Sequence, residues 1–474
     1  NLAILRPAPL RKRLWQGAAA MGLLLGTLVV GNFVIAPDKS VHAPMLGHDF
    51  LAFYTAGTFA RLGQFDHLYD LDATREIEHV LAQQNKLETG ASFGPFWNPP
   101  FYAWPLAALS KLSYTTALIV WTCFNLTCLG VAIVMLARML PPVVARPPPI
   151  MRLADDPVPL KFKRDWRNWA LVPMLVLSSM PFVQAISHGQ NTFASLLLLT
   201  LVVTAWRARM PVAAGLLCGL MLYKPQLAAV VAVMLILSMG SRVCLGLGFV
   251  AGSLMLIMGL TMPGVLDNYL TQLPLNLRFM QIDNAYLWER HATLKAFWRM
   301  LLQGRGAGEI SGVVIVLTTF SGAMIAAGLA GAWWRSRRPD IDDCWTGETR
   351  AASRDRLIGA TIVAMPLLMP FYFDYDLLLL SVPAVLFAGE MLSKPVGARL
   401  GRTERLLAGA WVGLYLWLMI NPPIARASAI NVTVVLLGTV AGLSIARACR
   451  RGARTSSTMA LVPEVQHVLV KRAA

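Results

Sequence analysis

Long apolar runs, separated by short polar or basic connectors, follow one another along almost the whole chain. Many of these runs hold roughly 17–25 residues, which is the length of helix that crosses a bilayer. Inside a bilayer every backbone polar group must be hydrogen-bonded within the protein, so runs of this length are typical of transmembrane helices. The pattern predicts an all-α, polytopic membrane protein.

The runs predict about twelve crossings, with both ends of the chain on the same side. The expected spans lie at 15–36, 100–138, 169–186, 192–206, 211–223, 225–237, 243–262, 310–334, 357–373, 377–391, 406–420 and 427–446. The stretch 100–138 breaks near 112–113, so we expect one crossing there plus a short, partly inserted piece. A transmembrane domain at 15–446 is then flanked by residues 1–14 and by a basic tail at 447–474.

The positions of Arg and Lys indicate how these spans are oriented. Arg11, Lys12 and Arg13 precede the first run, and basic residues gather again at 138–167, 335–356, 394–405 and in the tail. Because basic connectors stay in the cytoplasm, both ends are expected there, and 37–99 and 263–308 become outer loops. The first run is too long for a cleaved signal peptide.

The first outer loop, 37–99, carries two helical patterns. Residues 50–62 have apolar positions at helical spacing, and Asp49 stands just before them as a favoured N-cap residue. Residues 72–87 form a more polar, amphipathic pattern. Both helices are expected to lie along the membrane surface.

Composition supports the membrane assignment and narrows the function. Hydrophobic residues make up 56% of the 474 residues and charged residues only 14%, whereas soluble proteins carry about a quarter charged residues. The basic residues behind the net charge of +17 lie mostly in the connectors. This distribution indicates that they set the orientation of the spans and face anionic lipid head groups, and it argues against binding of nucleic acid. The six cysteines show no metal-ligand or disulfide spacing, and no Walker-type or HExxH motif is present.

Four sets of polar residues fall at the outer membrane level of this topology. They are Asp49; His188, Gln190 and Asn191; Lys224 and Gln226; and Asp374 and Asp376. Each set alone also fits a structural role, such as a helix cap or a snorkelling lysine. Ionisable residues at this depth are costly and usually mark function, and four distant sets at one depth predict a site.

A carboxylate beside a lone cation at the membrane boundary suits transfer from a lipid-linked phosphate donor. The carboxylate takes a proton from an acceptor hydroxyl, and the cation stabilises the departing phosphate. Aromatic and amphipathic surroundings hold the lipid and the sugar.

The same residues carry a resemblance to a known family. The blocks, in chain order, are His48-Asp-Phe-Leu-Ala-Phe-Tyr54 to Gly57 with Leu68-Tyr-Asp70, Asn98-Pro-Pro-Phe-Tyr102, His188-Gly-Gln-Asn191, Lys224-Pro-Gln226, and Pro370 to Asp376. This ordered set resembles glycosyltransferase family 87, whose members use polyprenyl-phosphate sugars and have the GT-C fold.

The resemblance implies an inverting transfer of a sugar, with mannose favoured, to a glycolipid or glycan outside the cytoplasmic membrane. Asp49 maps onto the general base and Lys224 onto the partner of the donor phosphate, aided by His188, Arg290 or His291. Substrate contacts are then expected at Tyr54, Gln190, Asn191, Gln226, Asp374 and Asp376. The segment Phe373-Asp-Tyr-Asp376 departs from a His-rich pattern of some members, so the role of its two aspartates stays open. No cofactor is required, although a metal at the acidic loop remains an alternative.

Other function classes share some of these features. A transporter or a flippase for lipid-linked glycans would also have many spans and intramembrane charges, but no internal repeat is apparent. A polysaccharide ligase or polymerase would use similar donors. A non-catalytic scaffold would not explain ionisable residues such as Asp49 and Lys224 at this depth. The chemistry of the four sets favours the glycosyltransferase.

Overall fold

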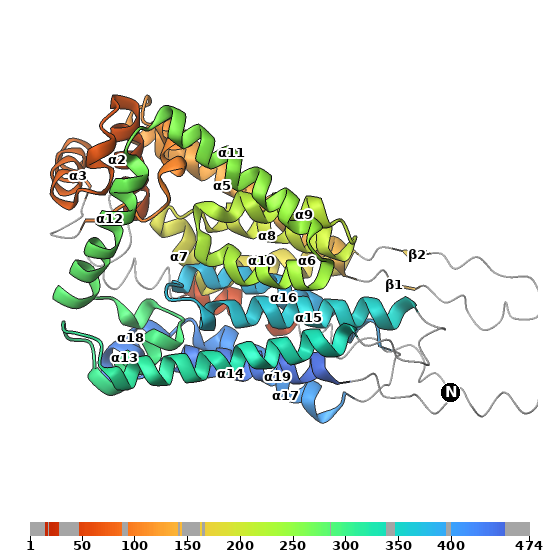
Figure 1. Cartoon of the computed structure of the whole chain (residues 1–474). Coiled ribbons are helices and arrows are strands. Elements are labelled where there is room, and N and C mark those ends of the chain that lie inside the picture. The colour runs from red at the N-terminus through yellow and green to blue at the C-terminus, as the bar shows by residue number, and fades with distance from the viewer. Residues whose placement is uncertain are drawn as a thin grey trace, which may run out of the picture.

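The computed structural model describes residues 15–17, 19–27, 47–87, 93–140, 143–144, 162–163, 166–284, 286–337, 347–394 and 400–450. Nearly all of its elements are helices, arranged as two stacked groups that run in the same general direction (Figure 1). The strands β1 (Val143–Val144) and β2 (Phe162–Lys163) form one short antiparallel pair.

The first group packs around α8 and α9. It contains α5 (Tyr114–Met139), α8 (Thr192–Arg207), α9 (Pro211–Leu220), α10 (Pro225–Met239) and α11 (Arg242–Thr261). Glycines allow α9 and α11 to cross closely, because a Cβ at Gly215 or at Gly246 would overlap the backbone of the other helix. Small residues at such crossings are a common device of helix packing in membranes.

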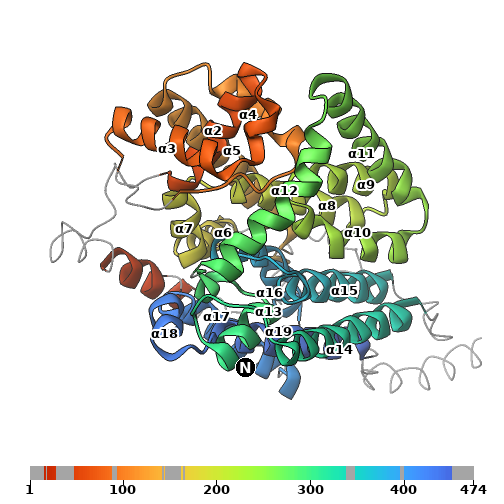
Figure 2. The same cartoon turned by 60° about the vertical axis from the view of Figure 1, so that its left-hand side comes forward.

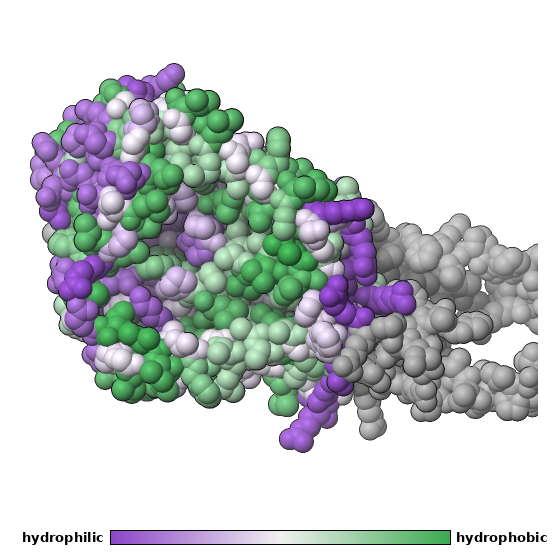
Figure 3. Space-filling model, in the orientation of Figure 1, coloured by the Kyte–Doolittle hydropathy of each residue, from purple (hydrophilic) through white to green (hydrophobic). Residues whose placement is uncertain are grey.

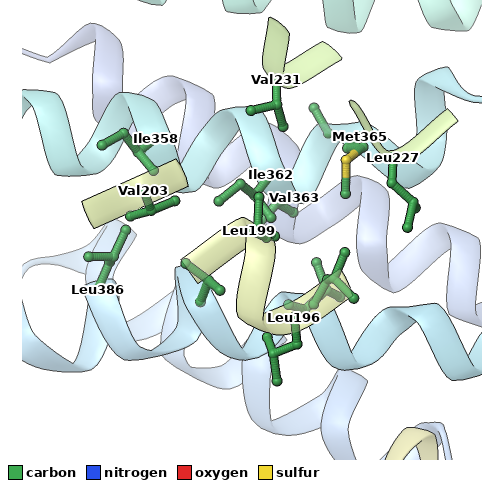
Figure 4. Close-up of a cluster of buried hydrophobic side chains, with 14 of the residues drawn as sticks. Leu196, Leu199, Val203, Leu227, Val231, Ile358, Ile362, Val363, Met365 and Leu386 are labelled. Carbon is green, nitrogen blue, oxygen red and sulfur yellow. The ribbon is translucent and has the colours of Figure 1, made fainter. Parts of the chain in front are cut away.

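The second group packs around α19 (Val432–Cys449). Its other members are α14 (Gly312–Arg337), α15 (Gly347–Leu368), α16 (Ser381–Leu392) and α17 (Arg402–Trp417). The apolar half of α15 is buried on all sides and joins the two groups through α8 and α10. Leu199, Val231 and Ile362 interdigitate at this junction (Figure 4).

The face of the bundle shown in Figure 3 carries an apolar belt between two polar ends. By length and composition, five helices qualify as membrane spans, or seven if each of two bent pairs counts as one. Three shorter apolar helices accompany them in the described part of the chain. The protein is therefore a multi-pass membrane protein, and the figure of about twelve crossings stays a prediction.

Both bent pairs differ from the straight spans that the sequence predicts. The expected span 169–186 is α6 (Trp166–Leu177) and α7 (Met180–His188), bent by 64°, and Pro181 lies at the start of α7. The expected span 406–420 continues into α18 (Asn421–Ser428) after a bend of 82°. Prolines near the starts of α7 and α18 interrupt the helical hydrogen bonds, so each apolar run forms two helices at an angle and not one straight span.

One end of the bundle, which we name the site end, is covered by shorter elements. They are α2 (His48–Leu62), η4 (Phe65–Tyr69), α3 (Leu71–Asn85), η5 (Pro100–Tyr102), α4 (Ala103–Leu109), α12 (Val265–Arg278), η8 (Phe279–Asp283), η9 (Trp288–Arg290) and α13 (Leu294–Gln303). Helix α12 runs across this end from the first group towards the second (Figure 2). The predicted break before residue 113 is confirmed, since α4 ends at Leu109 and Ser113 caps α5.

Helix α2 packs deeply into the protein, and its position along the membrane surface stays a prediction. Ten of its fifteen residues are buried, and Gly57 allows the backbone of α4 to approach closely at Leu106. The prediction of Asp49 as the N-cap is wrong. The cap is Gly47 at φ 80°, and Asp49 lies in the first turn, because glycine adopts this backbone conformation without a steric penalty.

The opposite end, which we name the basic end, holds the Arg-bearing last turns of several described helices. Arg207, Arg356 and Arg447 form ion pairs with carboxylates there. Arg447, which the sequence places in the basic tail, belongs to the last turn of α19 and is only 6% exposed. Residues 1–14 and 451–474 lie outside the described residues.

Candidate active site

The site forms where α2 meets α7. Gly47 and Gly189 both adopt positive φ, at 80° and 67°, and the backbone N–H of Gly47 donates to Ser187 O at 2.8 Å. A Cβ at Gly189 would come within 3.0 Å of the Gly47 Cα and the Phe50 Cβ. Only glycine fits this contact without strain, and the contact brings Asp49 and Gln190 together.

A chain of hydrogen bonds links four of the predicted residues. The Gln190 Nε2 donates to Asp49 Oδ2 at 2.5 Å, and Lys224 Nζ donates to Gln190 Oε1 at 3.4 Å. Lys224 also pairs with Asp376, at 3.1 Å to Oδ1 and 3.4 Å to Oδ2. One amide side chain therefore connects the Asp49 carboxylate with the Lys224 ammonium.

A second buried pair lies beside the first. The Arg290 guanidinium binds Asp374 in a bidentate manner, at 3.1 Å through Nε and 3.0 Å through Nη2. Its Nη1 donates to His188 Nε2 at 3.0 Å. Because arginine only donates, His188 accepts through Nε2, and its Nδ1 can donate to Gln184 O at 2.8 Å. This pattern describes a neutral imidazole, so His188 does not supply a positive charge.

The Tyr375 ring lies near both cations. Lys224 Nζ is 5.4 Å and the Arg290 Cζ 5.8 Å from its centroid. Phe373 stacks on the same ring with a centroid distance of 5.2 Å. Aromatic faces attract cations, so these rings help to keep the ammonium and the guanidinium at the site.

Asp49 differs from the other two carboxylates. Asp374 and Asp376 are 7% and 3% exposed, and each pairs with a cation. Asp49 is half-buried, and its hydrogen-bond partner among the described side chains is the neutral amide of Gln190. It is therefore the carboxylate of this group that is free to accept a proton.

Three predicted substrate residues lie at the edge of this network or away from it. The Tyr54 hydroxyl donates to Leu112 O at 2.8 Å, and Asn191 Nδ2 donates to the Tyr102 hydroxyl at 3.0 Å. Asn191 is fully buried. Gln226 is half-buried in the first turn of α10, and no described hydrogen bond ties its side chain to the network.

His291 does not act as the additional cation suggested for it. Burial and the charges of Arg290 and Lys295 lower the pKa of His291 to about 3, so the ring is neutral at physiological pH. Its Nε2 lies 2.9 Å from the Tyr286 hydroxyl, and its ring lies 4.1 Å from that of Phe373. We assign it to the support of the segment that carries Asp374.

The site also contains residues that the motif pattern did not single out. Gln184 Nε2 donates to Asp374 Oδ2 and the Thr192 hydroxyl donates to Asp376 Oδ1, both at 2.9 Å. Their positions in the sequence offered a signal, because Gln184 lies one helical turn before His188 and Thr192 directly follows Asn191. In the described part of the chain, no group of three or more His, Cys, Asp or Glu side chains is placed to hold a metal ion.

The sequence model of glycosyltransferase family 87 matches residues 96–370, which is more than half of the chain. The chain belongs to glycosyltransferase family 87. The match covers Gln190, Lys224 and Arg290, while Asp49 precedes it and Asp374 and Asp376 follow it. No curated protein and no solved structure shows significant similarity to the chain. The protein is thus a membrane glycosyltransferase that uses a sugar donor and an acceptor.

Proposed function

We propose that this family 87 glycosyltransferase transfers a sugar, with mannose favoured, from a polyprenyl-phosphate donor to a hydroxyl of a glycolipid or glycan. The reaction takes place on the outer side of the cytoplasmic membrane, where the positive-inside rule puts the site end. The apolar belt of the protein accepts the polyprenyl chain, and the GT-C fold and the inverting mechanism follow from the family resemblance.

The contrast among the three carboxylates carries this proposal. Asp374 and Asp376 are counter-ions of Arg290 and Lys224, whereas Asp49 lacks a cationic partner among the described residues. A general base has to be accessible and free to take a proton. Asp49 meets this requirement, and the Gln190 side chain links it to Lys224 by hydrogen bonds.

The two cations can bind the donor phosphate without losing their aspartates. Lys224 donates to the neutral Gln190 Oε1, and Arg290 donates through Nη1 to the neutral His188 Nε2. A phosphate oxygen is a stronger acceptor for a cation than an amide or an imidazole. The phosphate can therefore replace these neutral acceptors while both ion pairs remain intact.

The transfer then proceeds as a single displacement. The acceptor hydroxyl loses its proton to Asp49, and its oxygen attacks the anomeric carbon on the face opposite the phosphate. The bond between that carbon and the phosphate oxygen breaks, and the electron pair leaves with the polyprenyl phosphate. Lys224 and Arg290 stabilise the additional negative charge, and a β-linked donor gives an α-linked product.

The test is a transfer assay with membranes that contain the protein. Radiolabelled polyprenyl-phosphate mannose, glucose and arabinose are incubated with host lipid extract and with wild type, Asp49→Asn or the control Asp66→Asn. In Asp49→Asn the new amide oxygen still accepts from Gln190 but cannot take the proton. The control changes a side chain of the same loop that is 81% exposed.

We expect a labelled product with mannose from wild type and from Asp66→Asn. Asp49→Asn should form it at least about 100-fold more slowly. Equal rates in all three proteins would exclude Asp49 as the base, and the absence of product with every donor would refute the proposed reaction.

A further inference from the structure

Helix α3 buries a carboxyl group on its inward face. Thr74, Glu78 and Ala82, spaced by four residues, are each 3% exposed and face the protein interior. A buried carboxyl group is costly unless it is protonated or well paired, so Glu78 requires an explanation.

The partners of Glu78 are few. Its Oε2 accepts from the Gly94 N–H at 3.0 Å, and its Oε1 is buried without a hydrogen-bond partner in the described residues. Among the described residues, no Lys, Arg or His side chain forms a salt bridge with Glu78. Among the described residues, one backbone donor therefore holds the side chain.

That donor begins a segment which reaches the active site. In residues 93–98, Phe96 stacks on Tyr102 with a centroid distance of 6.5 Å, and Asn98 Nδ2 donates to Tyr223 O at 2.7 Å. Tyr223 directly precedes Lys224 and stacks on Tyr102 at 4.9 Å. Glu78 thus fastens one end of a segment whose other end holds the backbone next to Lys224.

The charged groups around Glu78 disfavour its ionised form. Asp49 on α2 acts on it as a like charge, and Tyr114 on α5 is within electrostatic range. Of the remaining titratable groups of α3 and η4, Glu76 is exposed and Tyr69 donates its hydroxyl to Asn98 O. The others make contacts at exposed or half-exposed positions: Arg75 with Asp72 and the Phe93 ring, His79 with Gln83, and His67 with Asp66 and Asp70. Burial, and to a lesser extent Asp49, raise the pKa of Glu78 to about 8 against the opposing Gly94 hydrogen bond.

We propose, on the basis of the function proposed above, that Glu78 is a positioning residue whose protonated carboxyl holds residues 93–98 against α3, and that its ionisation loosens the site. An ionised Glu78 would strengthen its bond to Gly94, but it would also bring an unpaired charge into the interior beside Asp49. Water reaches that charge when α3 and the segment 93–98 separate. The backbone support of Lys224 through Asn98 is then lost, and transfer slows at alkaline pH.

A first test measures stability and does not depend on sugar transfer. The melting temperature of the purified full-length protein is measured from pH 5 to pH 9 for wild type, Glu78→Gln and Glu76→Gln. The amide introduced by Glu78→Gln reproduces a protonated carboxyl, and Glu76 is an exposed neighbour on the same helix. The pKa of Glu78 rises on folding from 4.5 to about 8, so its contribution to stability is complete below pH 4.5 and is lost as the pH rises to 8.

We expect the melting temperature of Glu78→Gln to exceed that of wild type by an amount that grows from pH 5 to pH 8. Glu76→Gln should follow wild type throughout. Parallel curves for all three proteins would show that Glu78 is ionised when folded, and would overturn the proposal.

The second test measures transfer from labelled polyprenyl-phosphate mannose at the same pH values. If only the protonated form is active, the wild-type rate falls about tenfold at pH 9, where about a tenth of the groups keep their proton. Glu76→Gln should show the same fall and Glu78→Gln should not. An equal fall in Glu78→Gln would overturn the role in the reaction, whereas a lack of transfer by wild type at every pH would reject the proposed function and leave the stability test to judge Glu78.

Discussion

The two ends of the helix bundle both contain buried ion pairs, but they use them differently. At the basic end two of the carboxylates each lie between two cations. Glu390 accepts from Arg356 and forms an ion pair with Arg447, and Glu404 accepts from Lys394 and Arg447. These side chains belong to α15, α16, α17 and α19 or adjoin them, so the network ties these helices of the second group to one another.

At the site end the balance is reversed. Lys224 and Arg290 face three carboxylates, and the partner of Asp49 among the described side chains is an amide. Both cations also donate to neutral acceptors that an anion can replace. The comparison teaches that burial and pairing alone do not mark a reactive site. A reactive site is marked by a carboxylate without a cationic partner, here Asp49, and by cations that donate to neutral acceptors, which a substrate anion can replace.

The largest effect is expected when Lys224 is replaced. Lys224→Met leaves Asp376 buried without its cation, which should destabilise the protein by about 3–5 kcal/mol and slow transfer at least about 100-fold. The double variant Lys224→Met with Asp376→Leu removes both charges. Melting curves should show that it regains much of the stability, and the transfer assay should show that it remains inactive. Recovery of transfer in the double variant would mean that Lys224 serves the fold and not the phosphate.

A smaller effect is expected for Arg290→Lys. The positive charge stays, but the bidentate contact with Asp374 and the bond to His188 cannot both be reproduced by one ammonium group. Steady-state kinetics with varied donor should show transfer efficiency lower by about tenfold, with most of the change in KM for the donor. An unchanged KM combined with a reduced kcat would place Arg290 away from the donor phosphate.

The smallest effect on catalysis is expected at the basic end. Arg447→Met breaks contacts with Glu390 and Glu404 and should lower the stability by about 2 kcal/mol. Turnover per folded molecule, measured after correction for the folded fraction, should match wild type. A selective loss of turnover would show that the two ends are coupled and that the contrast between them is incomplete.

Much of this arrangement could be predicted from the sequence. In the described part of the chain the basic helix ends gather at one end of the bundle. The four predicted sets meet at the other end, where Asp49, Gln190, Lys224 and Asp376, one residue from each set, form a chain of hydrogen bonds. Ionisable residues inside apolar runs carry this information, because the cost of burying them is tolerated only where they meet partners.

The sequence could not predict features that depend on tertiary contacts. The N-cap of α2 is Gly47 and not Asp49, because the end of α7 packs closely against Gly47 and requires its positive φ. His291 is neutral because of the groups folded around it. Glu78 reads as one acid among many in the first loop, and only its place between Thr74 and Ala82 on the inward face of α3 sets it apart.

Donor binding and transfer, measured side by side on purified Asp49→Asn, test the central claim most directly. The labelled donor is bound to wild type and variant protein in detergent, and transfer is then followed in a single turnover after acceptor addition. The account predicts that the variant binds the donor as wild type does, because Lys224 and Arg290 are untouched, and that its transfer is at least about 100-fold slower. Transfer at the wild-type rate would contradict the assignment of Asp49 as the base, and loss of donor binding would show that Asp49 belongs to the donor site.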